Sequence, residues 1–180
     1  MMKAKDCIMG RRSVRAFKDQ AIDTDLIKQI VEEASYAPSW KHTQITRYTV
    51  VTNKEVKDRI GDCTSAYPHN GEIIKSAPAV VCVNFIKNRS GFERDGSYST
   101  DREWGWQPFD VGCACEAFCL AAYEHGLGSV IMGIFDRDKV EEVISLSDDR
   151  EVMCLIPIGY PAEEPVAPKR KPVDEVVNII

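Results

Sequence analysis

The sequence predicts an α+β fold in which helices flank a mixed central β-sheet. Segments with helical periodicity alternate with short β-rich segments along the chain. One segment, Ala79 to Phe85, is a near-continuous apolar run, which is typical of a strand covered on both faces. No repeat or linker-like stretch interrupts this alternation before the C-terminal tail. We therefore expect a single domain over residues 1–180, with an extended tail over residues 161–180.

The expected helices are recognised by their caps and apolar faces. Asp23 or Thr24 can cap the first of them, and Asp110 can cap the third. The third helix has a broad apolar face that includes small residues, which favour close packing. Helices are expected over residues 23–36, 54–62, 110–125 and 136–144.

The expected strands are short and rich in β-branched residues. They cover residues 47–52, 79–85, 129–131 and 152–158. Residues 86–109 are polar and aromatic and form the longest irregular stretch, and loops of that length are often functional. Residues 161–172 carry several prolines, so this part of the tail should run extended over a surface.

Composition excludes several classes of protein. The formal net charge of -5 argues against a nucleic-acid or anionic-membrane binder, because both need a dominant basic surface. The N-terminus has no apolar core of a signal peptide, and no apolar run has the length of a membrane span. The seven cysteines are expected to be reduced thiols. We therefore expect a cytoplasmic protein that binds neither nucleic acid nor membrane.

Two basic clusters lie near the ends of this acidic chain. Arg11, Arg12, Ser13 and Arg15 gather three guanidinium groups and a hydroxyl within five residues. Arginine suits phosphate because its planar fork donates two hydrogen bonds at once. The second cluster is Lys169–Lys171. Each could also be a solvated basic turn, but the two would form one phosphate site if the ends of the chain meet.

Two further segments carry turn residues that could approach a ligand. Pro38 and Ser39, followed by His42 and Gln44, form a helix-ending turn with three hydrogen-bonding side chains. Residues 126–133 contain glycine turns around a short strand, which can bring backbone amides close to a planar group. Taken alone, both segments are more often ordinary element ends.

Other familiar sites are not indicated. The chain has no Gly-x-Gly-x-x-Gly after a strand, no phosphate-binding Walker loop and no Gly-x-Ser-x-Gly elbow. Cys113, Cys115 and Cys119 are close in sequence, but only the last two share a helix face and no histidine completes a set. We expect buried core thiols and no metal, and no catalytic side chain is evident.

Taken in order, these segments resemble the nitroreductase family over nearly the whole chain. The carrying motifs are Arg11 to Phe17, Ala34 to Gln44, Ser76-Ala77-Pro78 before an apolar strand, Asp110-Val111-Gly112 opening an alanine-rich helix, Gly126-Leu127-Gly128, and Ile158 to Pro161 followed by the basic, proline-rich tail. The resemblance implies a nitroreductase-like fold, an intertwined homodimer and FMN bound between the subunits.

The same resemblance implies roles for individual residues. One subunit would hold the FMN phosphate and ring edge, and the other would approach with its helix-ending turn. NADH or NADPH would supply hydride, and a small acceptor such as a nitroaromatic or a quinone would then take it. The implied cofactor-binding residues are Arg11, Arg12, Ser13, Arg15, Lys169, Arg170, Ile131, Met132 and Gly133 of one subunit, and Pro38, Ser39, His42 and Gln44 of the other.

This sequence departs from the family pattern mainly where the acceptor would bind. His42 stands where Asn is usual, Ile45-Thr46 replaces Pro-Trp, and Met132 stands where Glu is often found. Trp104 and Trp106 could roof the pocket and stack on a flat acceptor, or could anchor the loop. The alternatives are a specialised flavin enzyme (a dehalogenase or a metabolite oxidase), a non-catalytic flavin-binding protein, or an anion-binding module without flavin.

Overall fold

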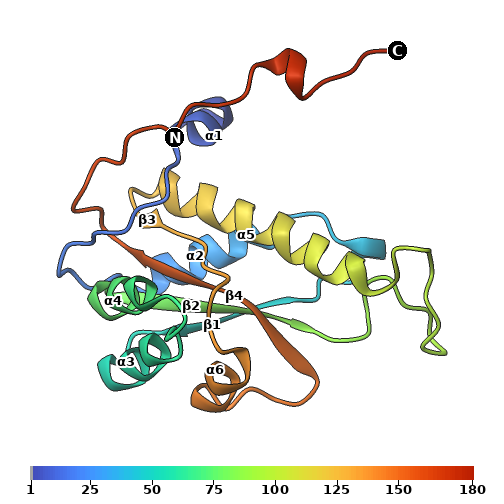
Figure 1. The fold of residues 1–180 in the computed structure, drawn as a ribbon, viewed down its shortest axis with the longest axis horizontal. Coiled ribbons are helices and arrows are strands. Elements are labelled where there is room, and N and C mark those ends of the chain that lie inside the picture. Colours follow the sequence, from blue (N-terminus) through green and yellow to red (C-terminus); the bar gives the residue numbers. More distant parts are fainter. Residues whose placement is uncertain (1) are drawn as a thin grey trace.

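The computed structural model describes residues 2–180, and in it helices cover both faces of a central sheet (Figure 1). Helices α2 (Thr24–Ala34) and α5 (Trp106–Glu124) pack on one face, and α3 (Lys54–Asp62), α4 (Pro68–Ser76) and α6 (Arg137–Val143) on the other. The strands are β1 (Thr46–Val51), β2 (Ala79–Ile86), β3 (Gly128–Ser129) and β4 (Arg150–Gly159), in the order β1-β2-β4-β3. Helix α1 (Ala4–Gly10) packs on α5, and 3₁₀ turns η1 (Trp40–His42), η2 (Glu103–Gly105) and η3 (Val173–Glu175) complete the elements.

Strand β2 is buried on both faces, as its apolar run predicts. Val81 and Val83 point to the core beneath α2 and α5, whereas Val80 and Cys82 point to the core beneath α3, α4 and α6. Successive side chains of a strand alternate between faces, so two cores need a strand that is apolar at every position.

The sheet is antiparallel, which corrects the mixed sheet predicted from the sequence. All three strand pairings are antiparallel, and parallel pairing among the described strands is limited to an isolated bridge between Ser13 and Ser129. Along the sequence, two helices (α3 and α4) connect β1 to β2. Because there are two of them, β2 starts at the same end of the sheet at which β1 stops. Helix α4 was not predicted from the sequence. With only one helix between β1 and β2, the pattern suggests a crossover that joins parallel strands.

Of the two helix caps predicted from the sequence, the one at Asp23 is correct and the one at Asp110 is wrong. The side chain of Asp23 accepts a hydrogen bond from the amide of Asp25, and that of Asp136 accepts one from Lys139, so both acids cap helices. Helix α5 begins at Trp106, which places Asp110 inside the helix and not at its cap. Its carboxylate is buried against two other segments of the chain, which local sequence does not reveal.

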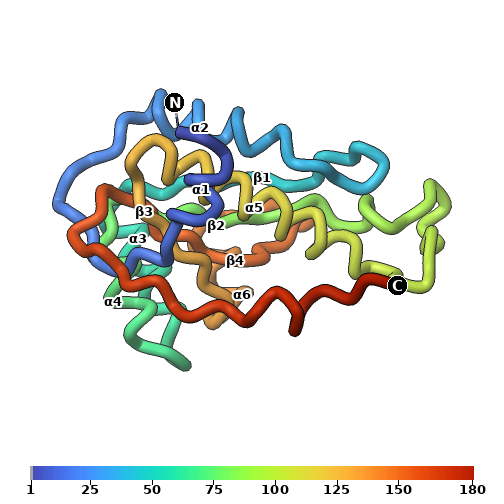
Figure 2. Tube along the Cα trace, turned by 90° about the horizontal axis from the view of Figure 1, so that it is seen from above, coloured from blue at the N-terminus to red at the C-terminus, as the bar shows by residue number. Residues whose placement is uncertain are grey.

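The C-terminal tail is extended, but most of it does not lie on the surface predicted for it. Its start is fixed to the N-terminal segment, because Ala162 donates to the carbonyl of Ala16 over 2.9 Å. Residues 166–180 are all exposed. Figures 1 and 2 show this part running in the general direction of α5 while lifted away from it.

Candidate functional site

The predicted arginine segment lies alongside the short strand β3. The amide of Val14 donates to the carbonyl of Ser129 over 3.0 Å, and Ser13 forms the parallel bridge to the same residue. The carboxylate of Glu163 accepts from the amides of Arg15 and Ala16 over 2.5 and 3.1 Å. The fold therefore brings the basic N-terminal segment together with the beginning of the tail, as a shared site requires.

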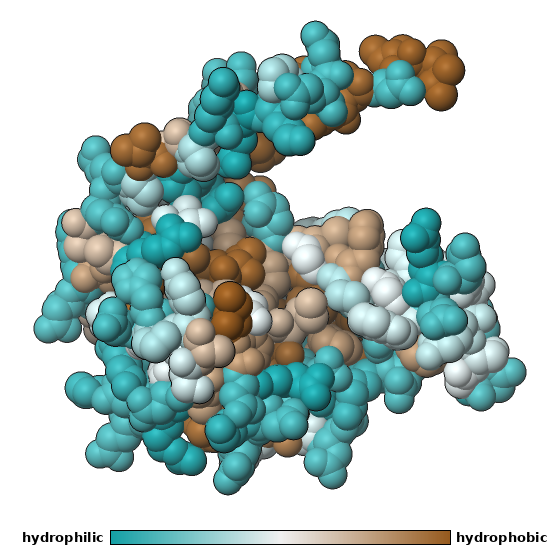
Figure 3. Space-filling view, viewed as in Figure 1, coloured by the Kyte–Doolittle hydropathy of each residue, from teal (hydrophilic) through white to brown (hydrophobic). Residues whose placement is uncertain are grey.

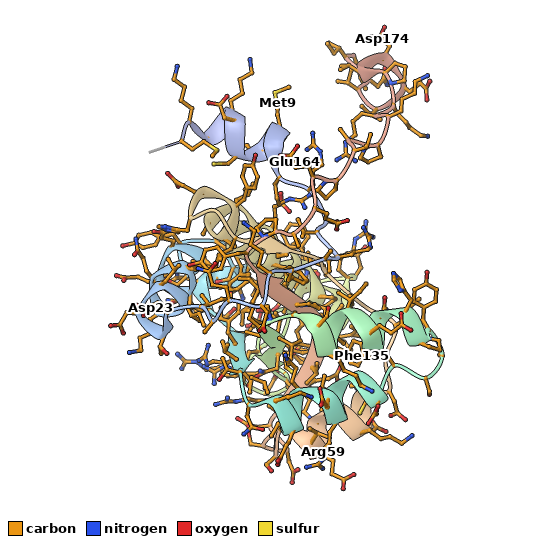
Figure 4. The ribbon with its side chains drawn as sticks, turned by 90° about the vertical axis from the view of Figure 1, so that its left-hand side faces the viewer. Met9, Asp23, Arg59, Phe135, Glu164 and Asp174 are labelled. Carbon is orange, nitrogen blue, oxygen red and sulfur yellow. The ribbon has the colours of Figure 1, made fainter. Side chains whose placement is uncertain are left out.

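The other basic cluster is not joined to the arginines within one chain. Lys169 and Arg170 are exposed, and no hydrogen bond or ion pair among residues 2–180 connects them to Arg11, Arg12 or Arg15. Figure 4 shows the tail passing Glu164 near the end of α1 and carrying Asp174 clear of the body. A cavity of about 750 Å³ lies between the tail and the N-terminal segment, lined by Arg12 and by residues 161–165 and 167 among others.

Arg11 is the arginine whose environment is most clearly suited to an anion. Its side chain is 22% exposed, and its Nε forms an ion pair with Oε1 of Glu116 at 3.7 Å, a distance too long for a hydrogen bond. Within the described chain this Nε is buried without a hydrogen-bond partner. A buried unpaired donor is costly, so an acceptor from outside the chain is expected there. The guanidinium and the neighbouring Ser13 hydroxyl are the donors that a phosphate group accepts from.

The segment Ile131–Gly133 follows β3, but Met132 faces inward. The amide of Met132 donates to the carbonyl of Leu155 over 2.8 Å, and its side chain is 4% exposed within the core. Ile131 and Gly133 are exposed on the opposite side. The departure at Met132 therefore changes the core, and Ile131 and Gly133 are the residues free to meet a ligand.

The remaining predicted residues form a tight turn at η1. Lys41, His42 and Gln44 have φ angles of 44°, 57° and 48°, in the left-handed region that costs a non-glycine residue about 1–2 kcal/mol. The side chains of His42 and Gln44 are exposed and approach to 2.7 Å. The following residue, Ile45, is fully buried, so that half of the Ile45-Thr46 departure concerns packing. Thr46 is half-buried and lines a cavity together with Gln44.

The two halves of the predicted site meet α5 at different points. Arg11 approaches Glu116, whereas the η1 turn is hydrogen-bonded to Asp110, a rise of about 9 Å along the helix. A cavity of about 320 Å³ is lined by Pro38, Ser39 and Gln44 but by none of the predicted arginines. One chain therefore does not join these residues into one pocket.

The two loop tryptophans have different environments. Trp106 anchors the loop: its indole N–H donates to Thr100 over 2.8 Å, and its ring lies 4.5 Å from that of Trp40. Trp104 is 59% exposed, as is Phe109 on α5. The sequence allows either tryptophan to stack on an acceptor or to anchor the loop. Of the two, only Trp104 has a face free for a flat ligand.

The cysteines on α5 belong to the interior. Cys115 and Cys119 are buried in the core beneath α2 and α5, and Cys113 is half-buried. Over residues 2–180, no three metal-ligating side chains gather into a cluster. Within the same range, every helix is too short or too polar to cross a bilayer.

Comparison with known proteins settles the family. A family model described as the nitroreductase family matches residues 8–66 and 63–160, which is most of the chain. The chain belongs to the nitroreductase family. A Methanothermobacter thermautotrophicus protein, named as a candidate NADH dehydrogenase/NAD(P)H nitroreductase, is 29% identical over 171 residues, covering 91% of this chain and 80% of the relative.

Solved structures of nitroreductase-type proteins share the fold. A nitroreductase family protein from Streptococcus pneumoniae TIGR4 superposes with a TM-score of 0.86 at 23% identity, covering 99% of this chain and 100% of that one. A candidate nitroreductase from Exiguobacterium sibiricum, solved in complex with FMN, has a TM-score of 0.84 at 20% identity, with 100% and 98% covered. The predicted family is thus confirmed, and these structures confirm the fold.

Proposed function

We propose that this chain is an FMN-dependent oxidoreductase that passes electrons from NADH or NADPH to a small organic acceptor. Family membership supports this, as do the names of its relatives and the FMN bound to a structural neighbour. The observation that carries the proposal is the arginine segment, which runs beside the strand leading to Ile131 and Gly133. In this segment the buried Nε of Arg11 has no hydrogen-bond partner among residues 2–180.

In this proposal the chain's own residues bind and orient the cofactor. Arg11, Arg12 and Ser13 hold the phosphate, with Lys169 and Arg170 of the tail added to the cradle. Arg15 faces the ring edge, where a cation stabilises negative charge that develops on reduction. Bound FMN supplies the hydride-accepting and hydride-donating chemistry, and the protein supplies position and electrostatics. Ile131 and Gly133 lie along the ring, while Pro38, Ser39, His42 and Gln44 come from the other subunit.

We propose that the active form is an intertwined homodimer. Helix α5 is apolar nearly all round, and its outward side carries Phe109, Gly112, Cys113, Ala117 and Leu120 at exposed or half-buried positions. A helix of this kind is normally buried on every side. Figure 3 shows apolar residues gathered over the α5 region, beneath an overhanging tail whose end is itself apolar. A second copy would cover both surfaces and would bring the η1 turn to the partner's arginines.

The acceptor we propose is a flat organic molecule such as a nitroaromatic or a quinone. Trp104 and Phe109 each expose more than half of their surface, and aromatic faces of that kind stack on planar rings. Since none of the predicted cofactor-binding residues is an aspartate or a glutamate, we expect protons for the acceptor to come from water.

We also propose that residues 1–180 form a single domain with an extended C-terminal tail, and that the protein is cytoplasmic. One sheet runs through the part of the chain between residues 46 and 159, and both cores pack on it. All seven cysteines are free thiols, which is usual in a reducing compartment.

The test is the absorption spectrum of the purified protein with added FMN, before and after anaerobic NADH and NADPH. Flavin bands that NADH or NADPH bleaches, and that a nitroaromatic or quinone restores, are expected. A flavin that neither donor bleaches would favour the binding protein, and a colourless protein that takes up no FMN would favour the anion-binding module. Fast turnover with one defined metabolite alone would favour the specialised enzyme.

A further inference from the structure

Asp110 is a buried acid with an unusual set of partners. It lies in the second turn of α5 and is 2% exposed. Its two carboxylate oxygens each lie 3.0 Å from the backbone amide of Trp40, and Oδ2 accepts from the Ser90 hydroxyl over 2.5 Å. No lysine or arginine among residues 2–180 forms an ion pair with it. Hydrogen bonds from two distant segments therefore stabilise this carboxylate in place of a counter-charge.

The Ser90 hydroxyl extends this network to the other end of the η1 turn. Ser90 lies 2.7 Å from the hydroxyl of Thr43. A hydroxyl has one hydrogen, and Ser90 gives it to Asp110, so Thr43 is the donor in the second bond. Asp110 thus holds Trp40 directly and Thr43 through Ser90. Trp40 is the first residue of η1, and Thr43 is the residue that follows η1.

The residues between Trp40 and Thr43 have a strained backbone conformation, which must be stabilised by surrounding contacts. Lys41 and His42 have positive φ angles, as does Gln44 just beyond Thr43. Their side chains are exposed, so core packing does not fix them. Strained backbone persists only where surrounding contacts over-determine it. Here Asp110 anchors both ends of η1, while the Ser39 hydroxyl accepts from the amide of Gln44 over 3.0 Å.

We propose that Asp110 is a positioning residue, which through Trp40 and Ser90 fixes the strained turn that presents His42 and Gln44 to the flavin of the other subunit. This inference rests on the proposed function, because it takes the contact between the turn and FMN from there. It goes beyond that function in assigning the geometry of the contact to an acid on α5 that is not among the predicted cofactor-binding residues.

The test measures the FMN dissociation constant of Asp110→Asn by quenching of flavin fluorescence. The amide keeps the size of the side chain but can no longer accept on both oxygens, so we expect affinity to fall about tenfold. Ser90→Ala should also lower FMN affinity, by a smaller factor. This variant replaces Asp110→Asn as the test if Asp110→Asn does not fold. Asp101→Asn, at an exposed acid in the loop before α5, is the matched control and should leave the constant unchanged.

A double-mutant cycle separates positioning from general support of the fold. In a His42→Ala/Gln44→Ala background the turn has no side chains left to position, so Asp110→Asn should cause no further loss of FMN affinity. An equal loss in both backgrounds overturns the inference, as does an unchanged constant for folded Asp110→Asn. If the unaltered protein binds no FMN at all, the proposed function has failed instead.

Discussion

At the scale of single residues, Arg11 holds a half-buried guanidinium whose Nε finds no acceptor among residues 2–180. If a phosphate is that acceptor, Arg11→Ala removes a charge-assisted bond of about 1.5–3 kcal/mol and should lower FMN affinity about tenfold or more. The FMN affinity of Arg11→Lys should lie between those of the unaltered protein and Arg11→Ala, because an ammonium keeps the charge but lacks the planar fork. Flavin content after purification measures the effect.

Arg59 on the solvent side of α3 provides the control for that experiment (Figure 4). Arg59→Ala removes the same charge far from the arginine segment and should leave flavin content unaltered. A full complement of flavin in Arg11→Ala would refute the role given to Arg11.

The cysteines allow a second prediction at this scale. Burial raises the pKa of Cys82 to about 12 and that of Cys119 to about 11, so little reactive thiolate forms near neutral pH. Six of the seven thiols are buried and Cys113 is half-buried. Iodoacetamide at pH 8 should therefore modify Cys113 first wherever the outward side of α5 is open to solvent, and all seven thiols in denaturant, as read by mass spectrometry. In the proposed dimer the partner covers Cys113, which should then react slowly as well. Labelling of Cys119 as fast as of a free peptide thiol would contradict this.

At the scale of elements, the end of α4 depends on a lysine from the neighbouring helix. Lys57 on α3 is buried, and its ammonium donates to the carbonyls of Lys75 and Ala77 where α4 ends. Lys57→Met keeps the apolar stem but removes this donor, and should lower the free energy of unfolding by about 1–3 kcal/mol.

Urea denaturation measures that loss, and Lys54→Met is its matched control. Lys54 is on the same helix, but its side chain is 80% exposed and its ion pair with Asp58 lies at the surface. Such pairs contribute less than about 1 kcal/mol. Equal destabilisation by the two substitutions would show that the buried donor has no special part in ending α4.

At the scale of the whole molecule, the outward side of α5 is the test of the proposed dimer. Ala117→Arg adds a long charged side chain to the middle of that side. We expect the variant to elute as a monomer in size-exclusion chromatography and to lose FMN, since both halves of the site are then separated. Ala66→Arg, at an exposed position between α3 and α4, should change neither property. A stable dimer in Ala117→Arg would place the interface elsewhere.

Much of the fold could be predicted because its signals are local. The caps at Asp23 and Asp136 and the two-sided strand at Ala79 follow from neighbouring residues alone. Strand direction could not be predicted in the same way, because it depends on α4, whose pattern is weak. The buried role of Asp110 was missed for a related reason: Trp40 and Ser90, its partners, are 70 and 20 residues away.

For the site, sequence was sufficient to name the arginine segment and the η1 turn, because guanidinium groups and motif order are readable along the chain. Tertiary structure decided which atoms are available. Pairing with Leu155 turns Met132 inward, and Ile45 is buried in the core, whereas Thr46 is half-buried beside a cavity. It also separates the two halves of the site along α5. The physical reason is that burial and hydrogen-bond pairing are properties of distant segments brought together, which residue order alone does not specify.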